Sequence, residues 1–575
     1  MFKKSPKNCF KPVLPSSSSY KGSAENEVVI ATPTPTVGSA SSEQHNKSNN
    51  GPILSYFNYF LLPQVDIITH QNQEYMPIDI RVSTNDTMNQ VYVSSSIYAH
   101  LCDIKHQIER YQDTWDNIKK FTNPYEYIHS NITGNKTNIS KLRPLSRSFY
   151  KMIEIVKNNN ILSRYQHTIV NKPEYKMGIK TFHLAEGPGG FIEAISYLRG
   201  LEYHGNGTDY SSVLDATPTG ENDGNAAFAA AFAASSSSIQ ILKRNTEFHD
   251  EYMKEQEYLK LTRRIFENQK SDSSGGTSAS ASASTAKNLY GNDRYYGMTL
   301  VNDDPICPGW KKTRAFLESH PNVIIENGAD KTGNLISLEN FLYCAEKYKN
   351  KMDIVTADGG FDFSVDFNHQ ETMATKLILC EVFYALALQK QGGSFILKIF
   401  DVFHKATVDI LYILSYYYDH VSIMKPYTSR IANSEKYVIC QGFKITDSTQ
   451  IIQQFANIFD SIQKSSSGDV LSSLLPFEHD LYFLNKIEDM NAMVSFQQIE
   501  NITSTLSIIT NHRNSEKLEQ YKRANVNKCI AWCEKYEIPH NAHHACFQST
   551  NIFLHKSIPM VVGGGGVGVG VGVGM

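Results

Sequence analysis

The middle of the chain alternates short apolar runs with amphipathic stretches. The apolar runs predict strands at Thr181–Ala185, Tyr295–Thr299, Val323–Ile325, Asp353–Ala357 and Ser394–Ile399. Between the last two runs, Glu371–Lys390 predicts a helix, because apolar residues recur on one face and Gly392-Gly393 ends it. Strands that alternate with helices predict an α/β fold with a mainly parallel sheet, whose ligands lie at the carboxyl ends of the strands.

Two further strand-like runs, His420–Lys425 and Lys436–Gly442, follow this region. The connection between them is too short for a parallel crossover, so we expect an antiparallel hairpin at the edge of the sheet. Upstream, Pro77–Val82 is strand-like, and helical patterns cover Tyr92–Trp115 and Ser146–Ile155.

Shifts in composition predict the domain organisation. Residues 1–52 are rich in Ser, Pro, Thr and Asn and are predicted to be disordered. A globular N-terminal extension (53–140) precedes the α/β domain (141–445), which carries a low-complexity insertion at 204–290. A mainly helical C-terminal region (446–555) and a Gly/Val-rich tail (556–575) follow.

The net charge and the cysteine content are compatible with several classes of protein. The formal net charge of the 575 residues is −3, so binding to RNA phosphate would need a local basic cluster. The nine cysteines, with no secretory leader, predict reduced thiols. No apolar run approaches the length of a membrane span, so we expect a soluble intracellular protein, in the cytoplasm, nucleus or a virion.

A glycine-rich turn offers the first candidate chemistry. Ala185–Phe191 links a predicted strand to a predicted helix, whose free N–H groups suit a nucleotide or an amino-acid carboxylate. The alternative is an ordinary loop. The glycine spacing departs from GxGxxG, which argues against a nicotinamide-dependent oxidoreductase. The later segment Gly328–Leu335 carries polar groups that could bind an adenine edge, or it is a solvated turn.

Three charged residues are predicted to reach the same crevice. Asp358 follows an apolar strand beside two glycines, although a turn aspartate can also cap its own loop. Lys398 interrupts an apolar strand, and lysine is rarely buried unless it is paired; the alternative is an edge-strand lysine that extends to solvent. Glu435 opens the final strand, or is a solvated hairpin charge.

A basic cluster precedes the glycine turn. Arg147 and Lys151 lie four residues apart and share a helix face, with Lys141 and Arg143 close in sequence. Such a cluster suits RNA phosphate, and its alternative is a solvated helix face.

Taken together, these segments resemble the FtsJ-type S-adenosylmethionine-dependent ribose 2′-O-methyltransferases, especially the mRNA cap enzymes of eukaryotes and large DNA viruses. The resemblance lies in HLAEGPGGF, YYGMTL, VTADGGFD, GGSFILKIFD and SRIANSEKYVICQG, within residues 140–203 and 291–445. It implies a Rossmann-like seven-stranded sheet with an antiparallel last strand, flanked by mainly helical extensions. It also implies S-adenosyl-L-methionine as cofactor, RNA (capped mRNA in particular) as partner, and no metal.

The resemblance also assigns site residues. The catalytic tetrad would be Lys151, Asp358, Lys398 and Glu435. Cofactor contacts would come from Ala185, Glu186, Gly187, Pro188, Gly189, Gly190, Phe191, Asn334, Leu335 and Asp358. Substrate contacts would come from Arg147, Asn368, His369, Gln370 and Glu435. Two features depart from the family pattern: the long insertion, and Glu186 in place of a small residue.

In the mechanism that this implies, Lys398 is the candidate base for the ribose hydroxyl. To be half neutral at pH 7 its pKa must fall about 3 units from its usual value. Burial and Lys151 would lower this pKa, whereas Asp358 and Glu435 would raise it. Asp358 would orient Lys398 and face the cationic donor, Lys151 would hold the oxygen, and Glu435 would fix the lysines and the ribose.

Other functions stay open at this point. The enzyme could methylate rRNA or tRNA, or the chain could be a non-catalytic RNA-binding subunit with the same fold. A candidate zinc site is the group Cys529, Cys533, His540, His543, His544 and Cys546, which are close in sequence. Its spacing matches no common zinc finger, and Cys529 and Cys533 are spaced like core residues on one helix face.

Overall fold

The computed structural model describes residues 58–65, 75–83, 90–166, 178–204, 292–301, 309–360, 368–465, 469–511 and 515–541. The segments predicted as a disordered N-terminus (1–52) and a Gly/Val-rich tail (556–575) lie outside these residues, as does the predicted insertion (204–290) apart from its first residue.

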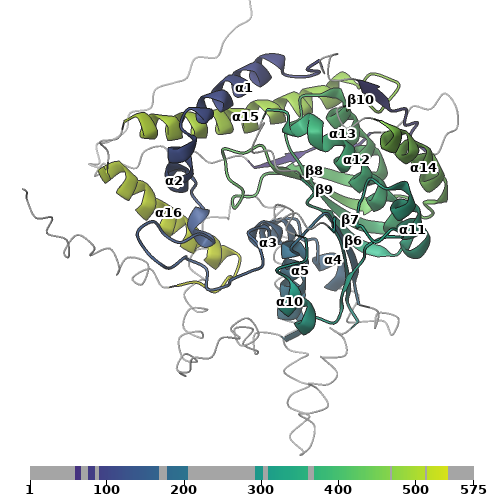
Figure 1. The fold of residues 1–575 in the computed structure, drawn as a ribbon, viewed down its shortest axis with the longest axis horizontal. Helices are drawn as coiled ribbons and strands as arrows, with labels where there is room; N and C mark the ends of the chain where they lie inside the picture. The colour runs from purple at the N-terminus through teal and green to yellow at the C-terminus, as the bar shows by residue number, and fades with distance from the viewer. Residues whose placement is uncertain are drawn as a thin grey trace, which may run out of the picture. The chain divides into compact units, whose positions relative to one another are not determined.

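A sheet of eight strands lies at the centre, in the order β1-β8-β9-β7-β6-β3-β4-β5 (Figure 1). The strands are β1 (Tyr59–Leu61), β3 (Lys180–Leu184), β4 (Arg294–Met298), β5 (Val323–Ile325), β6 (Met352–Ala357), β7 (Gln389–Ile399), β8 (Tyr418–Met424) and β9 (Lys436–Phe443). The pairings among β5, β4, β3, β6 and β7 are all parallel, whereas β9 runs antiparallel to both β7 and β8. The predicted α/β fold with a mainly parallel sheet is confirmed.

The predicted strands correspond to β3 through β9, and β1 is an addition that was not predicted. Tyr59–Leu61 pairs antiparallel with β8. The hairpin of β8 and β9 forms as expected, but β9 enters the sheet between β7 and β8. The outer edge is therefore β1 and not the hairpin.

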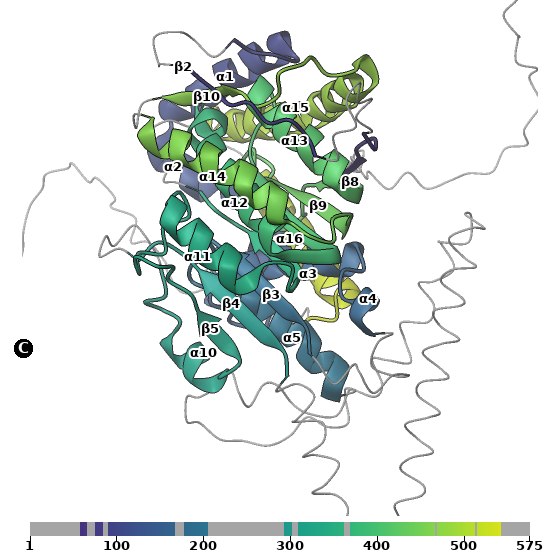
Figure 2. The same cartoon turned by 90° about the vertical axis from the view of Figure 1, so that its right-hand side faces the viewer.

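Helices cover both faces of the sheet (Figures 1 and 2). One face carries α3 (Ser148–Asn158) and α5 (Gly190–His204), with α4 (Ser163–Gln166) and α10 (Arg314–Ser319) nearby. The other face carries α11 (Leu338–Tyr348), α12 (Gln370–Leu388), α13 (Lys405–Tyr417) and α14 (Thr449–Lys464). The predicted helix Glu371–Lys390 is thus confirmed, except that its last two residues already belong to β7.

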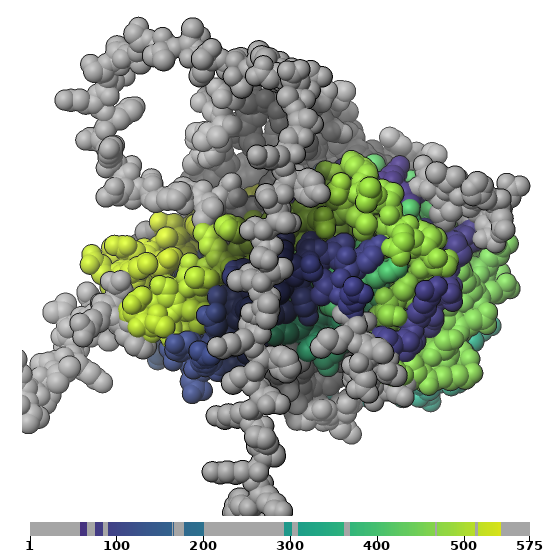
Figure 3. Space-filling view, turned by 90° about the horizontal axis from the view of Figure 1, so that it is seen from above, coloured from purple at the N-terminus to yellow at the C-terminus, as the bar shows by residue number. Residues whose placement is uncertain are grey.

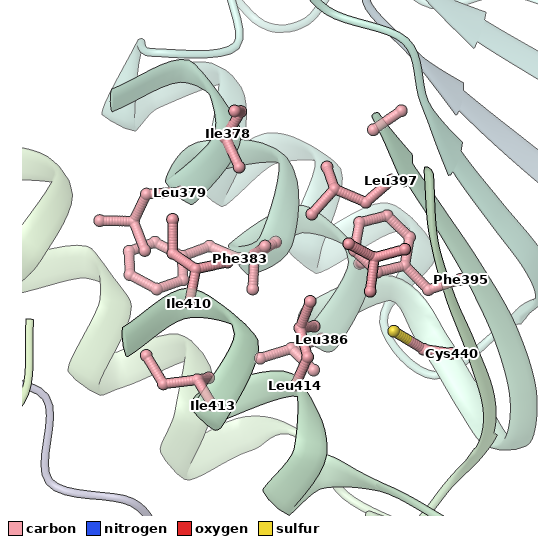
Figure 4. Close-up of a cluster of buried hydrophobic side chains, with 14 of the residues drawn as sticks. Ile378, Leu379, Phe383, Leu386, Phe395, Leu397, Ile410, Ile413, Leu414 and Cys440 are labelled. Carbon is pink, nitrogen blue, oxygen red and sulfur yellow. The ribbon is translucent and has the colours of Figure 1, made fainter. Parts of the chain in front are cut away.

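Strand alternation divides the core between the two faces. In β7, Phe395 and Leu397 pack with α12 and α13, as Figure 4 shows, whereas Ile396 packs with α3 and α5. Lys398 is two residues beyond Ile396, so its side chain is directed to the α3 face. The alternation thus places the charged side chain of Lys398 on the same face of the sheet as α3.

The N- and C-terminal extensions pack against each other. The N-terminal one contains α1 (Ser95–Glu109), α2 (Gln112–Thr122) and the 3-10 helix η1 (Glu126–Ile128), and the C-terminal one contains α15 (Leu481–Thr510) and α16 (Ser515–Lys535). Figure 3 shows their purple and lime surfaces side by side. A satellite core joins α1, α2 and α15 to the segment after β7 through Leu101, Ile104, Trp115, Phe403, Ile502, Leu506 and Ile509.

Smaller contacts reinforce this arrangement. The hydroxyls of Thr122 and Thr505 lie 2.7 Å apart. β2 (Arg81–Ser83), where a strand was predicted at Pro77–Val82, pairs with β10 (Val470–Ser473).

Within the described ranges, no helix has the length and apolar character to cross a membrane.

Candidate active site

The loops that follow β3, β4, β5 and β6 meet at one edge of the sheet. The backbone N–H of Ala185 donates to Met298 (2.7 Å), and that of Asp358 donates to Leu184 (3.2 Å). The Gly328–Leu335 loop reaches the end of β4, where the N–H of Val301 donates to Thr332 (2.7 Å). The glycine turn, this loop and the Asp358 turn are therefore neighbours at the carboxyl ends of the strands, as the sequence predicted.

The glycine turn is shaped by contacts within the protein. The N–H of Gly189 donates to the carbonyl of Glu186 (2.7 Å), which closes the turn. A Cβ atom on Gly190 would lie 2.3 Å from the hydroxyl oxygens of Ser146 and Ser148. Glycine at this position thus lets α5 begin in contact with the start of α3, a packing requirement that is separate from any approach to a ligand.

Glu186 occupies part of the helix end that was expected to face a ligand. Its side chain is buried, and its Oε1 accepts from the N–H of Phe191 in the first turn of α5. Burial raises the pKa of this carboxyl well above its usual value. The N–H of Phe191 is therefore not free, contrary to the expectation of open N–H groups. The second oxygen, Oε2, is buried without a hydrogen-bond partner among the described residues.

The four predicted tetrad residues meet beside this turn. The Nζ of Lys151 on α3 lies 2.7 Å from Oε1 of Glu435, just before β9. The Nζ of Lys398 on β7 lies 3.3 Å from Oδ1 of Asp358 and donates to the Asp358 carbonyl at 2.7 Å. Side chains that are far apart in sequence thus form two ion pairs in one cluster.

Tyr437 joins the two ion pairs. Its hydroxyl lies 3.0 Å from Oδ1 of Asp358 and 3.4 Å from Oε1 of Glu435. It stands directly opposite Lys398 in the register of β7 and β9. Sequence reasoning missed Tyr437, although the predicted strand pairing and its position two residues after Glu435 were signals that could have identified it.

The charge balance keeps Lys398 protonated. Burial lowers the pKa of the Lys398 amine, but the negative charges of Asp358, Glu435 and Glu381 outweigh it, and the net direction is upward. A neutral Lys398 would need a lowered pKa, and this geometry does not supply one, because Asp358 first and then Glu435 raise it, as foreseen, with Glu381 as a further contributor that the sequence did not indicate. The pKa of Glu435 is lowered to about 2, since Lys151 and Lys398 outweigh its burial.

The loop between β8 and β9, which carries Glu435, is fastened from several sides. Lys425, at the end of β8, is buried and donates to the Asn433 carbonyl (2.6 Å) and the Glu435 carbonyl (2.9 Å). Ser429 donates to Oε1 of Glu435 (3.0 Å). On α15, the Gln498 amide donates to the Ala432 carbonyl (2.8 Å). These hydrogen bonds therefore hold the backbone at Glu435 in place.

The predicted basic cluster is partly engaged inside the protein. Arg147 pairs with the buried Glu126 (2.8 Å) and donates to the Thr428 carbonyl through Nε (3.1 Å) and Nη2 (2.6 Å). Lys151 pairs with Glu435, whereas Lys141 and Arg143 are exposed. Contact between Arg147 and a substrate stays a prediction, and its observed partners give it a structural role.

The other predicted contacts lie around the same edge. Gln370, at the start of α12, accepts from the Ser434 hydroxyl (2.9 Å) beside Glu435, and Asn368 and His369 directly precede it. Asn334 is exposed and its Oδ1 accepts from the N–H of Ile336 (3.0 Å), whereas Leu335 is buried. Their roles toward substrate and cofactor stay predictions.

The first two cysteines of the candidate zinc group pack as core residues. Cys529 and Cys533 are buried on α16 among Tyr127, Tyr150 and Trp532. His540 is described, whereas His543, His544 and Cys546 lie outside the described residues. Among the residues that are described, no group of His, Cys, Asp or Glu is arranged to hold a metal ion.

Comparison with known proteins identifies relatives. A family model described as FtsJ-like methyltransferase matches residues 271–443, which include Asp358, Lys398 and Glu435 but begin after Lys151 and the glycine turn. The cap-specific mRNA (nucleoside-2′-O-)-methyltransferase 1 of Trypanosoma brucei brucei is 33% identical over 184 residues, which make up 31% of this chain and 49% of the relative.

Two proteins of Caenorhabditis briggsae are also similar. The cap-specific mRNA (nucleoside-2′-O-)-methyltransferase 1A is 28% identical, over 39% of this chain and 27% of the relative. The protein named inactive cap-specific mRNA (nucleoside-2′-O-)-methyltransferase 1B is 27% identical, over 39% of this chain and 28% of the relative. The matched region thus spans half or less of each of these relatives.

Proposed function

We propose, from the premise that this chain contains an FtsJ-like methyltransferase domain, that it methylates the ribose 2′-hydroxyl of an mRNA cap nucleoside. The observation that carries this proposal is the cluster of Lys151, Asp358, Lys398 and Glu435, with pairs at 2.7 and 3.3 Å. Capped mRNA as the substrate is supported by the names of the relatives.

The residues at the sheet edge fit S-adenosyl-L-methionine as the cofactor, which would supply a methyl group on a cationic sulfonium. Oε2 of Glu186 is buried and has no hydrogen-bond partner among the described residues, although Nδ1 of His183 lies 3.7 Å away, so a polar group of the cofactor could hydrogen-bond to it. The Asp358 carboxylate suits a neighbouring cation. The turn Ala185–Phe191, the segment Asn334-Leu335 and Asp358 would hold the cofactor between them.

The tetrad would orient and activate the ribose hydroxyl. Lys151 comes from α3 and Lys398 from β7, so that an oxygen bound between their amines would meet two cationic groups as its charge develops. Glu435 and Asp358 hold the two amines at fixed positions, with Tyr437 between the carboxylates. Alignment of donor and acceptor by fixed groups supplies much of such an acceleration.

Lys398 acts as the base only when the negative charge around it is balanced. With Asp358, Glu435 and Glu381 nearby, its pKa is raised and its amine stays charged. Positive charge placed next to Asp358 would weaken this effect and lower the pKa of Lys398. The proton of the ribose hydroxyl could then pass to the Lys398 nitrogen, with the protons shared within a coupled cluster.

The test is methyl transfer to short RNAs of one sequence, one with a 7-methylguanosine cap and one uncapped, with isotope-labelled cofactor and mass mapping of the product. We expect the label on the 2′-oxygen of a cap-proximal nucleotide in the capped RNA alone. Equal labelling of uncapped RNA, or preferential labelling of rRNA or tRNA transcripts, would reject the cap assignment. No transfer to any RNA would favour a non-catalytic RNA-binding subunit.

A further inference from the structure

A third carboxyl group of the cluster, that of Glu381, lies beneath the Asp358 turn. Glu381 on α12 is fully buried, and its Oε1 accepts from the N–H of Gly359 at 3.1 Å. A Cβ atom on Gly359 would lie 2.2 Å from this oxygen, so glycine is what admits the carboxyl under the turn. The other oxygen, Oε2, is buried without a hydrogen-bond partner among the described residues.

Glu381 is electrostatically coupled to the tetrad. Burial raises its pKa to about 8, Lys398 acts to lower it, and Asp358 acts to raise it. In turn, Glu381 contributes to the raised pKa of Lys398. The ionisable groups around Glu381 and Lys398 include Asp358 after β6, Glu435 before β9, Tyr437 on β9, Lys151 on α3, Lys425 at the end of β8 and Cys380 on α12.

We propose that Glu381 is a positioning residue of the site, which holds the Asp358-Gly359-Gly360 turn and sets, through its charge, when the Lys398 amine carries a proton. The role of the amine in methyl transfer rests on the proposed function. Glu381 contacts the turn through the N–H of Gly359, and in this role it acts only through the turn and through Lys398.

The position of the Glu381 carboxyl allows it both to hold the turn and to influence the Lys398 amine. One oxygen anchors the backbone next to Asp358, and the partly titrating charge lies in a water-poor interior, where charge interactions are strong. While Glu381 is ionised, Lys398 holds its proton and its contact with Asp358. When Glu381 is neutral, Lys398 releases its proton more readily.

Glu381→Gln separates these two actions. The glutamine oxygen can still accept from the N–H of Gly359, but the side chain cannot ionise. If Glu381 only holds the turn, Lys398 should therefore titrate identically in the wild type and the variant. Glu193→Gln is a matched control, because Glu193 is also buried, its pKa is raised to about 7, and it accepts from one backbone N–H, that of Leu145 (2.8 Å).

The experiment measures the pH dependence of Lys398 acetylation by acetic anhydride in the folded full chain, by mass spectrometry of the Lys398 peptide. We expect the midpoint for Lys398 to fall by roughly one pH unit in Glu381→Gln, the size of a partly screened charge interaction. The midpoint should be unchanged in Glu193→Gln. An unchanged midpoint in Glu381→Gln would overturn the proposal.

Two further measurements keep the test decisive. If Glu381→Gln does not fold, as judged by circular dichroism, Glu381→Met removes the same charge at similar length and carries the same expectation for Lys398. The pH profile of methyl transfer should shift in the same direction as the labelling midpoint. A wild type without transfer activity would reject the proposed function, while the labelling would still decide the role of Glu381.

Discussion

Glu126 of the N-terminal extension lies 2.8 Å from the guanidinium of Arg147, one helical turn before Lys151. The same carboxylate also pairs with Arg430 at 2.9 Å, in the loop that leads to Glu435. Glu126 therefore ties together the two segments that carry the Lys151–Glu435 pair. Its pKa is strongly lowered, because the two arginines outweigh its burial.

Replacement of Glu126 by alanine should lower stability and catalysis together. It leaves the largely buried Arg147 without its carboxylate, and breaking a buried pair in this way costs at most about 3–5 kcal/mol. Urea unfolding followed by circular dichroism measures this cost. Glu318→Ala removes the exposed pair with Arg314 and should change stability by less than about 1 kcal/mol. Equal effects of the two variants would contradict the role of Glu126.

Lys398→Ala should reduce methyl transfer by about 10²–10⁴-fold, the usual contribution of a general acid or base. Binding of S-adenosyl-L-methionine, measured by calorimetry, should stay near the wild-type value, because the predicted cofactor contacts come from other segments. Lys464→Ala, which removes an exposed lysine on α14 paired with Asp460, is the control and should keep full activity. Full activity of Lys398→Ala would remove this residue from the mechanism.

Tyr437→Phe should lower kcat by roughly 10- to 150-fold, the effect of about 1.5–3 kcal/mol from one hydrogen bond to a charged group. The ring contact with Phe191, with centroids 5.9 Å apart, can remain, so the protein should keep its fold. Steady-state kinetics with capped RNA measures the change. Wild-type kcat in this variant would show that the bridge between Asp358 and Glu435 does not serve catalysis.

The sequence predicts features that depend on neighbouring residues, but not contacts between residues far apart in the chain. Local patterns sufficed for the hairpin of β8 and β9 and for Lys398, because period-two alternation and an out-of-place charge are visible in a short window. The partners of Arg147 could not be found in this way, since Glu126 is 21 residues away. The sequence therefore predicts a phosphate contact for Arg147, whereas its partner Glu126 comes from the predicted N-terminal extension.

Glu381 illustrates the same limit on α12. In the sequence it is one of three charged residues in a mostly apolar helix, and nothing nearby indicates that it lies under Gly359, 22 residues earlier. Strand β1 was missed for a related reason, since Tyr59–Leu61 has only three residues and becomes a strand through its pairing with β8. Both features depend on tertiary packing, which periodicity does not report.

Glu435 should give the protein an acid-sensitive part of its stability. Its pKa in the folded state is about 2, below the usual value near 4.3 for an unfolded chain. A group with a lowered folded pKa stabilises the fold fully above its unfolded pKa, and this stabilisation is lost as the pH falls through the folded pKa. The window is therefore about pH 4.3 down to 2, and the contribution is on the order of 3 kcal/mol.

Glu435→Gln removes this titration while keeping the size of the side chain. The free energy of unfolding of wild type and variant, measured in urea from pH 7 to 2, should differ most above about pH 5. The difference should shrink as the pH falls, because protonated Glu435 and glutamine are both neutral. Glu488→Gln, which changes a carboxylate on α15 outside the tetrad, is the control and should give a small difference at every pH. A constant difference for Glu435→Gln across the window would show that the charge of Glu435 does not stabilise the site through Lys151 and Lys398.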